Sequence, residues 1–394
     1  MRNPAILGIF VLATIIVGCG GGNTATSGSK QPIDIPVIAP VTGPAAFLGK
    51  EEQQAFQVLE GIVSQQGGIG GRPVHFVVQD DQSNPSVDVQ LANQIIAQKS
   101  PVFIGPSLVA GCNAVAPLVK SGPVMYCMSP GIHPDAGSFA FTGSVSTQDL
   151  IRALIAYLRG TGITRLAVLS STDATGQDAL SGIKAVLSDP ANASVKIVAD
   201  ERFNLTDVSV AAQVTHVKGS GAQALIAWST GAAIATVFKA VAQVGLDIPV
   251  ATTDGNMTYA QMAQYKDFLP AQLLIPAPEW VASDSITDSK VKSAIKTFND
   301  GFKSAGSPPD IGQALAWDPG LIVVAALRSQ GADAPAEKIR NYLAHLKGFA
   351  GINGQYDFTA AAQRGLSDRQ AVVTRWDAAK GTWVPVSGPG GAPK

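Results

Sequence analysis

The chain has 394 residues, of which 46% are hydrophobic and only 14% are charged. This length and composition allow a large buried core and favour two domains, which excludes a single small module. The 28 Lys and Arg residues are balanced by 29 Asp and Glu residues, so the chain lacks the basic surface that phosphate backbones require, and nucleic acid is not an expected partner.

The first 19 residues have the pattern of an export signal. Arg2 precedes an apolar run, residues 5–17, that is too short to span a bilayer as a stable helix. The run ends in the sequence IVGC at Cys19, which resembles the lipobox of bacterial lipoproteins, in which the cysteine is lipidated and begins the mature chain. An uncleaved apolar anchor or a buried helix is the alternative.

Residues 20–32 are rich in Gly, Ser and Thr and contain few apolar side chains. Such a segment cannot offset the entropy lost on ordering, so it is predicted to be a flexible tether. Together with the signal peptide, it predicts a protein that is exported and held by a lipid at the membrane, facing the periplasm or the cell exterior.

Export to an oxidising compartment changes the expectation for the two remaining cysteines. Cys112 and Cys127 can form one intrachain disulfide, with two free, buried thiols as the alternative, because sequence does not fix the Cα separation that a bridge needs. The four histidines are scattered without metal-ligand spacing, so neither a metal site nor a metal cofactor is predicted.

From residue 33 onward, short apolar β-rich runs alternate with amphipathic stretches. Strands are predicted at residues 33–38, 74–78, 102–104, 124–127, 166–169, 195–198, 224–227 and 249–251. Helices are predicted at residues 51–65, 87–98, 114–120, 148–158, 177–187, 208–218 and 232–244. Continuous apolar strands separated by single helices indicate an α/β fold with mainly parallel sheets flanked by helices.

The same alternation occurs before and after about residue 148, which predicts two similar lobes. Lobe one is expected to comprise residues 33–148 and about 276–350, and lobe two residues 149–275 and about 351–386. The Gly- and Pro-rich residues 387–394 are predicted to be a frayed tail. Because ligands bind at the carboxyl ends of parallel strands, two facing lobes would place two such edges across a cleft.

At these loops the chain resembles the branched-chain amino acid (Leu/Ile/Val) binding proteins, which are type I periplasmic solute-binding proteins of ABC importers. The resemblance rests on an ordered set of short segments over residues 33–386, none of which is specific alone. The segments are Pro40-Val41-Thr42-Gly43, Gln66-Gly67-Gly68-Ile69-Gly70-Gly71, Asp80-Asp81, Ile104-Gly105-Pro106, Ser129-Pro130, Phe141-Thr142 and Val244-Gly245-Leu246. The resemblance implies a two-lobed fold that closes on a small molecule without a cofactor, and ABC transporter permease subunits as partners.

When the ligand-contact positions of the family are transferred to this sequence, the resemblance implies a ligand site assembled from loops of both lobes. Its residues would be Phe47, Val109, Ala110, Gly111, Gly131, His133, Thr175, Trp228, Thr230 and Asp254. Ala110 and Gly111 are expected at a helix start, where unpaired N–H groups can bind a carboxylate. Asp254 follows a strand and is expected to neutralise an ammonium group, with an ordinary turn or cap residue as the alternative.

Three of these residues have an equally ordinary structural role. His133 either donates to an anionic ligand or stabilises its own loop. Trp228 either lines an apolar pocket or belongs to the core, and Thr230 either contacts ligand or caps a helix. The chain has no hydroxyl at Val109 or at Ile132 and His133, and no Tyr at the position of Thr175, where the family usually has them, and these departures argue against plain leucine or valine as ligand.

An enzyme is not predicted. The sequence contains no G-x-S-x-G segment, no paired His and Cys at a recognisable spacing, and no metal or phosphate motif. The closer alternative to a transport protein is a ligand sensor that uses the same fold to signal to a separate partner chain.

Replacing Cys19 by Ser tests the predicted lipid anchor. Because a serine hydroxyl cannot be lipidated through a thioether, the variant should appear in the soluble fraction while the parent sediments with membranes. Identical fractionation of the two proteins would contradict the lipoprotein interpretation.

Overall fold

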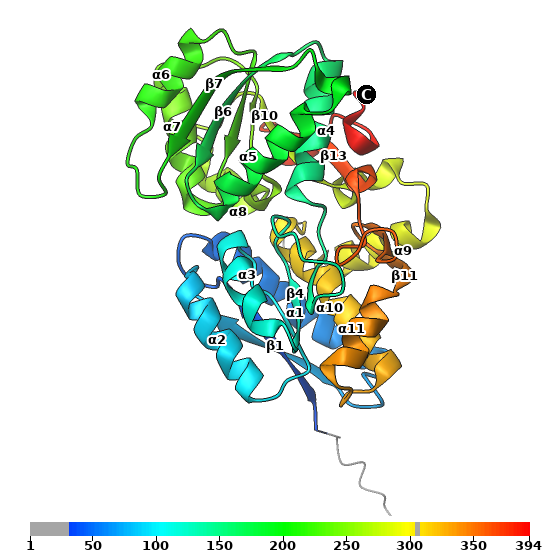
Figure 1. Cartoon of the computed structure of the whole chain (residues 1–394). Helices are drawn as coiled ribbons and strands as arrows, with labels where there is room; N and C mark the ends of the chain where they lie inside the picture. Colours follow the sequence, from blue (N-terminus) through cyan, green and yellow to red (C-terminus); the bar gives the residue numbers. More distant parts are fainter. Residues whose placement is uncertain (1–30, 304–307) are drawn as a thin grey trace, which may run out of the picture.

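The computed structural model describes residues 31–303 and 308–394, which form two α/β lobes (Figure 1). The predicted signal peptide, Cys19 and most of the predicted tether lie outside the described residues. The chain changes lobe three times among the described elements: after Thr142, between Pro278 and Ile311, and between Asp357 and Ala371. Within the described residues, no helix combines the length and the apolar character that crossing a membrane requires.

Lobe one is built on a five-stranded sheet in the order β2-β1-β3-β4-β5, in which all paired strands are parallel. Its strands are β1 (Ile33–Ala39), β2 (Val74–Asp80), β3 (Val102–Ile104), β4 (Val124–Cys127) and β5 (Ala140–Thr142). Its helices are α1 (Ala46–Gln65), α2 (Pro85–Ala97), α3 (Val109–Val115), α10 (Ile311–Gln330) and α11 (Ala336–Ala344). The predicted parallel α/β architecture is therefore confirmed for this lobe.

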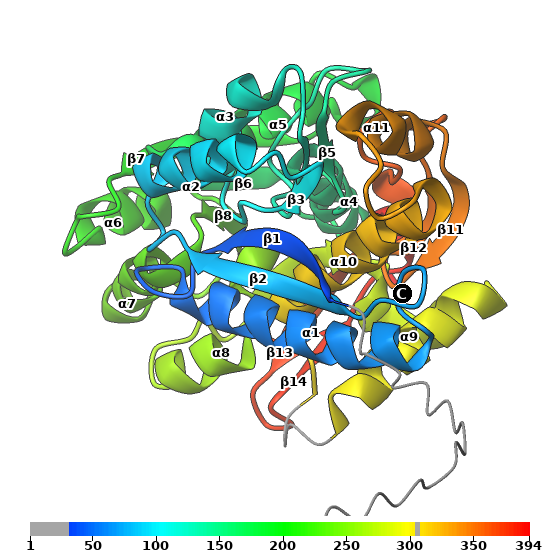
Figure 2. The ribbon, with the colours of Figure 1, turned by 90° about the horizontal axis from the view of Figure 1, so that it is seen from below.

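The inner strands β3 and β4 of lobe one are apolar and fully buried because helices cover both faces of the sheet. Val37 packs in a core with residues of α1 and α10, whereas the next residue, Ile38, packs in a second core with α2 and α3. Figure 2 shows α1 on one side of β1 and α2 on the other. Successive side chains of a strand point to opposite faces, so each face buries its own apolar set.

Lobe two contains a seven-stranded sheet in the order β14-β13-β10-β9-β8-β6-β7. Five strands are parallel to their neighbours: β6 (Arg165–Ser171), β7 (Lys196–Phe203), β8 (Ala224–Trp228), β9 (Val250–Ala251) and β10 (Leu273–Pro278). The antiparallel strands β13 (Ala371–Asp377) and β14 (Thr382–Pro385) complete one edge. The helices are α4 (Thr147–Gly160), α5 (Ala174–Leu187), α6 (Ala211–Gly219), α7 (Ile234–Val244) and α8 (Tyr259–Tyr265).

Helix α9 (Ser289–Gly301) and the small antiparallel pair β11 (Lys347–Gly351) and β12 (Gly354–Asp357) belong to neither large sheet. The predicted limits near residues 148 and 350 fall in the first turn of α4 and inside β11. The exact residues at which each lobe begins and ends therefore stay a prediction, whereas the structure shows which strands belong to each sheet.

The prediction of a frayed tail at residues 387–394 is wrong. Ser387 is fully buried, and its hydroxyl accepts a hydrogen bond of 2.7 Å from the backbone N–H of Val373 in β13. A Cβ atom at Gly391 would lie only 1.9 Å from the carbonyl oxygen of Ala153 in α4. The glycines that suggested fraying instead allow the backbone to pack closely against a helix.

Cys112 and Cys127 are joined by a disulfide, with a Cα–Cα distance of 6.1 Å. Both side chains are fully buried in the core between the sheet and α2 and α3. The bond links the first turns of α3 to the end of β4, so it connects two adjacent loops at the carboxyl edge of the lobe-one sheet.

Replacing both cysteines by alanine should lower the free energy of unfolding by about 3 kcal/mol, because the cross-link closes a loop of 15 residues. Urea unfolding of the parent and the double variant measures the difference. If both thiols of the folded, unreduced parent react with an alkylating reagent, the bond is absent in solution and the expected loss does not apply.

Candidate functional site

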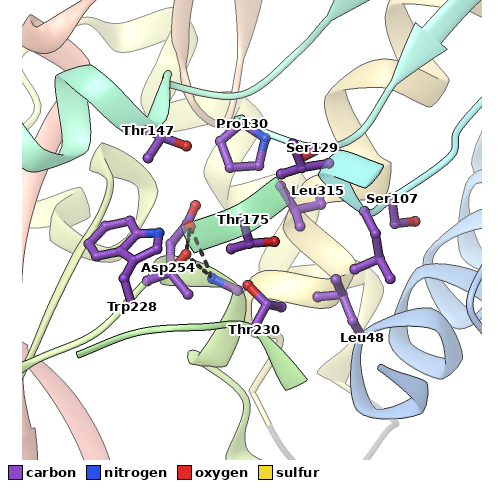
Figure 3. Close-up of a pocket in the computed structure, with 14 residues that line it drawn as sticks. Leu48, Ser107, Ser129, Pro130, Thr147, Thr175, Trp228, Thr230, Asp254 and Leu315 are labelled. Carbon is purple, nitrogen blue, oxygen red and sulfur yellow. Dashed lines mark hydrogen bonds between the residues drawn. The ribbon is translucent and has the colours of Figure 1, made fainter. Parts of the chain in front are cut away.

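A small cavity lies between the lobes, at the carboxyl ends of the parallel strands of both sheets (Figure 3). Lobe one contributes Leu48, Ser107, Leu108, Val109, Ser129, Pro130 and Leu315, and lobe two contributes Thr147, Thr175, Trp228, Thr230, Thr253, Asp254 and Gly255. Its volume of about 30 Å³ holds roughly two water molecules. The lobes are thus closed on each other, and they must separate to admit a molecule as large as an amino acid.

Asp254 is the one charged residue among the described residues that line the cavity. It begins the short turn Asp254–Asn256 after β9, and Thr253 caps that turn. Its Oδ1 atom accepts hydrogen bonds from the Thr253 hydroxyl at 2.9 Å and from the Gly255 N–H at 3.0 Å. Its Oδ2 atom is buried and has no hydrogen-bond partner. One oxygen therefore holds the loop, and the other is left for a donor that the protein does not supply.

Burial raises the pKa of Asp254 to about 6, while the hydrogen bonds from Thr253 and Gly255 partly oppose this shift. The carboxyl group is thus ionised at neutral pH but close to its titration range. An unpaired buried carboxylate is costly, so a cationic or hydrogen-bond-donating group in the cavity would stabilise the ionised form.

Trp228 ends β8, and its side chain lies beside Asp254 at the cavity wall (Figure 3). It is 1% exposed and also packs in the core of lobe two, so both roles expected for it are combined in one residue. Thr230 also lines the cavity, and its hydroxyl makes no capping hydrogen bond at the following turn. Val109 and Thr175 line the cavity from the first turns of α3 and α5.

The other predicted site residues lie outside the cavity lining. Phe47 contacts Tyr265 of α8 edge-to-face, with ring centroids 6.4 Å apart, and so joins the lobes at one rim. Ala110 is half-buried behind Val109, and a Cβ atom at Gly111 would lie 2.2 Å from Oδ2 of Asp88 in α2. Gly111 therefore packs against α2, on the side of α3 away from lobe two.

Gly131 and His133 belong to a loop of lobe one that contacts α5 of lobe two. The Nε2 atom of His133 lies 2.7 Å from Oδ1 of Asp178, and the His133 side chain is 59% exposed. His133 therefore holds its loop against the opposite lobe, which is the structural alternative raised for it.

Sequence reasoning missed several residues of the wall. Ser107 and Ser129 lie three and two residues after the ends of β3 and β4, so their position in a loop after a strand was the available signal. The Ser107 hydroxyl donates a hydrogen bond of 2.6 Å to Oε2 of buried Glu52. Leu315 comes from α10, far along the chain, and no local pattern points to it. Among the described residues, no group of three or more His, Cys, Asp or Glu side chains is arranged to hold a metal ion.

The curated relatives that match are Leu/Ile/Val-binding proteins. BraC3 of Rhizobium johnstonii is 24% identical over 191 residues, which is 47% of this chain and 51% of that protein. The leucine-, isoleucine-, valine-, threonine- and alanine-binding protein of Pseudomonas aeruginosa is 21% identical over 232 residues, 57% of this chain and 61% of that one. The matches thus span about half to three fifths of these relatives.

Solved structures share the fold at low sequence identity. A Rhodopseudomonas palustris solute-binding protein in complex with benzoate superposes with a TM-score of 0.76 at 20% identity, covering 92% of this chain and 97% of that one. LivJ of Streptococcus pneumoniae in complex with isoleucine gives a TM-score of 0.74 at 19% identity, covering 90% and 100%. These neighbours are two-lobed type I periplasmic binding proteins. The family model described as "Periplasmic binding protein" matches residues 32–382, and the chain belongs to this family of solute-binding proteins, which are not enzymes.

Proposed function

We propose that this protein is the lipid-anchored, extracytoplasmic substrate-binding component of an ABC importer, and that it binds an amino acid or a related small molecule that carries an ammonium or other donor group. The observation that carries this proposal is the buried, unpaired Oδ2 atom of Asp254 at the wall of the inter-lobe cavity. Family membership and the names of the relatives support a transport role.

The ligand would place its ammonium group against Asp254, which removes the cost of leaving that oxygen unpaired. Its apolar part would contact the side chains of Leu48, Val109, Trp228 and Leu315, which come from both lobes. A site of this kind is completed only when the lobes close, because each lobe supplies part of the wall.

An anionic group of the ligand would bind on the side of the cavity opposite Asp254. The Ser129 hydroxyl oxygen accepts a hydrogen bond of 3.3 Å from the N–H of Gly131, which leaves its proton free to donate. Thr147 is the first residue of the 14-residue helix α4, whose positive end favours negative charge. The Ser129 and Thr147 hydroxyls would donate to a carboxylate without a cationic side chain in the lining, while Asp149 in the first turn of α4 weakens the contribution of the helix field.

Asp254→Ala should weaken the binding of an ammonium-bearing ligand by roughly 2 to 5 kcal/mol, the scale of removing one partner of a buried charge pair. A thermal-shift screen of amino acids, amides, aromatic acids and short organic acids selects the ligand, which at a hundred times its Kd adds about 2.7 kcal/mol of stability. Isothermal titration then compares the parent with the variant. Asp267→Ala, which removes an exposed carboxylate from the same lobe, is the matched control.

Equal affinity of an ammonium-bearing ligand for the parent and for Asp254→Ala would show that Asp254 is only a turn residue. If the best ligand is an acid without a donor group, the variant should bind it as well as the parent or better. That result would keep the transport role and overturn the amino-acid-like ligand.

The affinity for an ammonium-bearing ligand should rise with pH through about 6, because Asp254 must ionise to attract the cation. Below that value the change approaches about tenfold per pH unit, since each bound ligand releases one proton. The raised pKa of Asp254 also affects the free energy of unfolding of the ligand-free protein, which falls as the pH rises. The contribution of Asp254 to this free energy is full below the unfolded pKa of about 3.9 and is lost as the pH rises through about 6. Titrations between pH 4.5 and 7.5 measure the first effect, and Asp254→Asn should abolish it.

A further inference from the structure

The contact between α5 and the lobe-one loop after β4 joins the lobes outside the ligand cavity. Asp178 of α5 extends to this loop, where its Oδ1 atom lies 2.7 Å from Nε2 of His133. The Asp178 side chain is only 10% exposed, and its Oδ2 atom is buried without a hydrogen-bond partner. A carboxylate of lobe two is therefore buried largely by lobe one.

Gly131 provides the space for this carboxylate. A Cβ atom at Gly131 would lie 2.7 Å from Oδ2 of Asp178 and 2.6 Å from Cγ2 of Val109, both too close for a real side chain. Val109 lines the ligand cavity, so Gly131 lies directly between the cavity wall and the carboxylate. We name the contact of Asp178 with Gly131 and His133 the closure contact.

Arg364 fixes the lobe-one side of the closure contact. Its buried guanidinium donates hydrogen bonds to the carbonyl oxygens of Ile132, at 2.5 Å, and Ser144, at 2.7 Å. Ile132 lies between the two lobe-one residues of the contact, and Ser144 lies in a segment that connects the lobes. Burial lowers the pKa of Arg364 to about 10, and the negative charges of Asp149 and Asp178 oppose this shift. At neutral pH the Arg364 guanidinium is thus a cation that attracts the Asp178 carboxylate, which offsets the cost of burying the unpaired Oδ2 atom.

The closure contact differs between the open and closed states, because separation of the lobes returns Asp178 and His133 to water. Interactions that one state makes and the other lacks shift the equilibrium between them. We infer that Asp178 is a positioning residue that stabilises lobe closure from outside the ligand site, through Gly131, His133 and Arg364. This inference rests on the proposed function, in which closure of the lobes retains the ligand.

Asp178→Asn should lower the ratio of closed to open molecules by about tenfold, within the usual range of coupling between sites. The measurement is the distance between spin labels on cysteines introduced at the exposed positions Gln90 of α2 and Lys184 of α5, in the full chain carrying Cys19→Ser. It is made without ligand and with L-isoleucine or benzoate as probes. The apparent Kd of a probe that binds should rise by the same factor, because only the closed fraction retains it.

His133→Ala is the second variant, since its exposed position makes unfolding an unlikely source of any change. It should lower the closed fraction by about threefold, the scale of a partly exposed polar side-chain pair. In a protein that already carries Asp178→Ala, adding His133→Ala should not lower the closed fraction further, because the contact between the two side chains is already lost. Asp267→Asn should leave all distances unchanged.

Unchanged label distances and unchanged probe affinity in Asp178→Asn would overturn the inference. A protein whose label distances respond to Asp178→Asn but which binds no small molecule would leave the closure contact standing and overturn the proposed function. The two failures are thereby distinguished.

Discussion

The parallel strands of both sheets point their carboxyl ends at the opposite lobe, and the position of the cavity follows from this constraint. Loops that leave these ends carry short helices and turns whose N–H groups and hydroxyls have no partner within their own element. Closing one such edge on the other produces a small space with polar and apolar walls that neither lobe contains alone. Wall residues as distant in sequence as Ser107 and Asp254 become neighbours only through this arrangement.

Elements with a strong local pattern could be predicted from the sequence. The expected strands at residues 33–38 and 224–227 agree closely with β1 and β8, because buried parallel strands are continuous apolar runs. Strand β10 was missed because it contains Pro276 and Pro278, residues that remove hydrogen-bond donors and argue against a central strand. Its antiparallel pairing with β13 makes it part of the sheet all the same. The packing of the C-terminal residues against α4 depends on tertiary contacts that no local pattern records.

The predicted ligand contacts that line the cavity lie at or just after a strand end or in the first turn of a helix, and their contact with ligand stays a prediction. Trp228 is the last residue of β8, Asp254 lies three residues after the end of β9, and both line the cavity. Gly131 and His133 also follow a strand, but their neighbours come from α5, and the sequence contains no signal for which loop of one lobe meets which helix of the other. The same limit hid Leu315. Local sequence thus places a residue at the sheet edge, whereas lobe closure decides whether it faces ligand or protein.

Lobe one contains several buried acidic residues, and their pKa values decide which of them are ionised at neutral pH. Burial raises the pKa of Glu52 to about 8, so this residue, which accepts a hydrogen bond from Ser107, holds its proton at neutral pH. Burial also raises the pKa of both Asp81 and Asp88, which interact with each other and can share a proton. Glu52 can therefore stay buried without a cation, and Asp81 and Asp88, which together hold one proton, lie outside the cavity lining. Asp254, with its pKa near 6, is ionised under the same conditions. The negative charge at the described cavity wall is therefore that of Asp254, so selection for an ammonium group depends on Asp254 being ionised while Glu52, behind Ser107, keeps its proton.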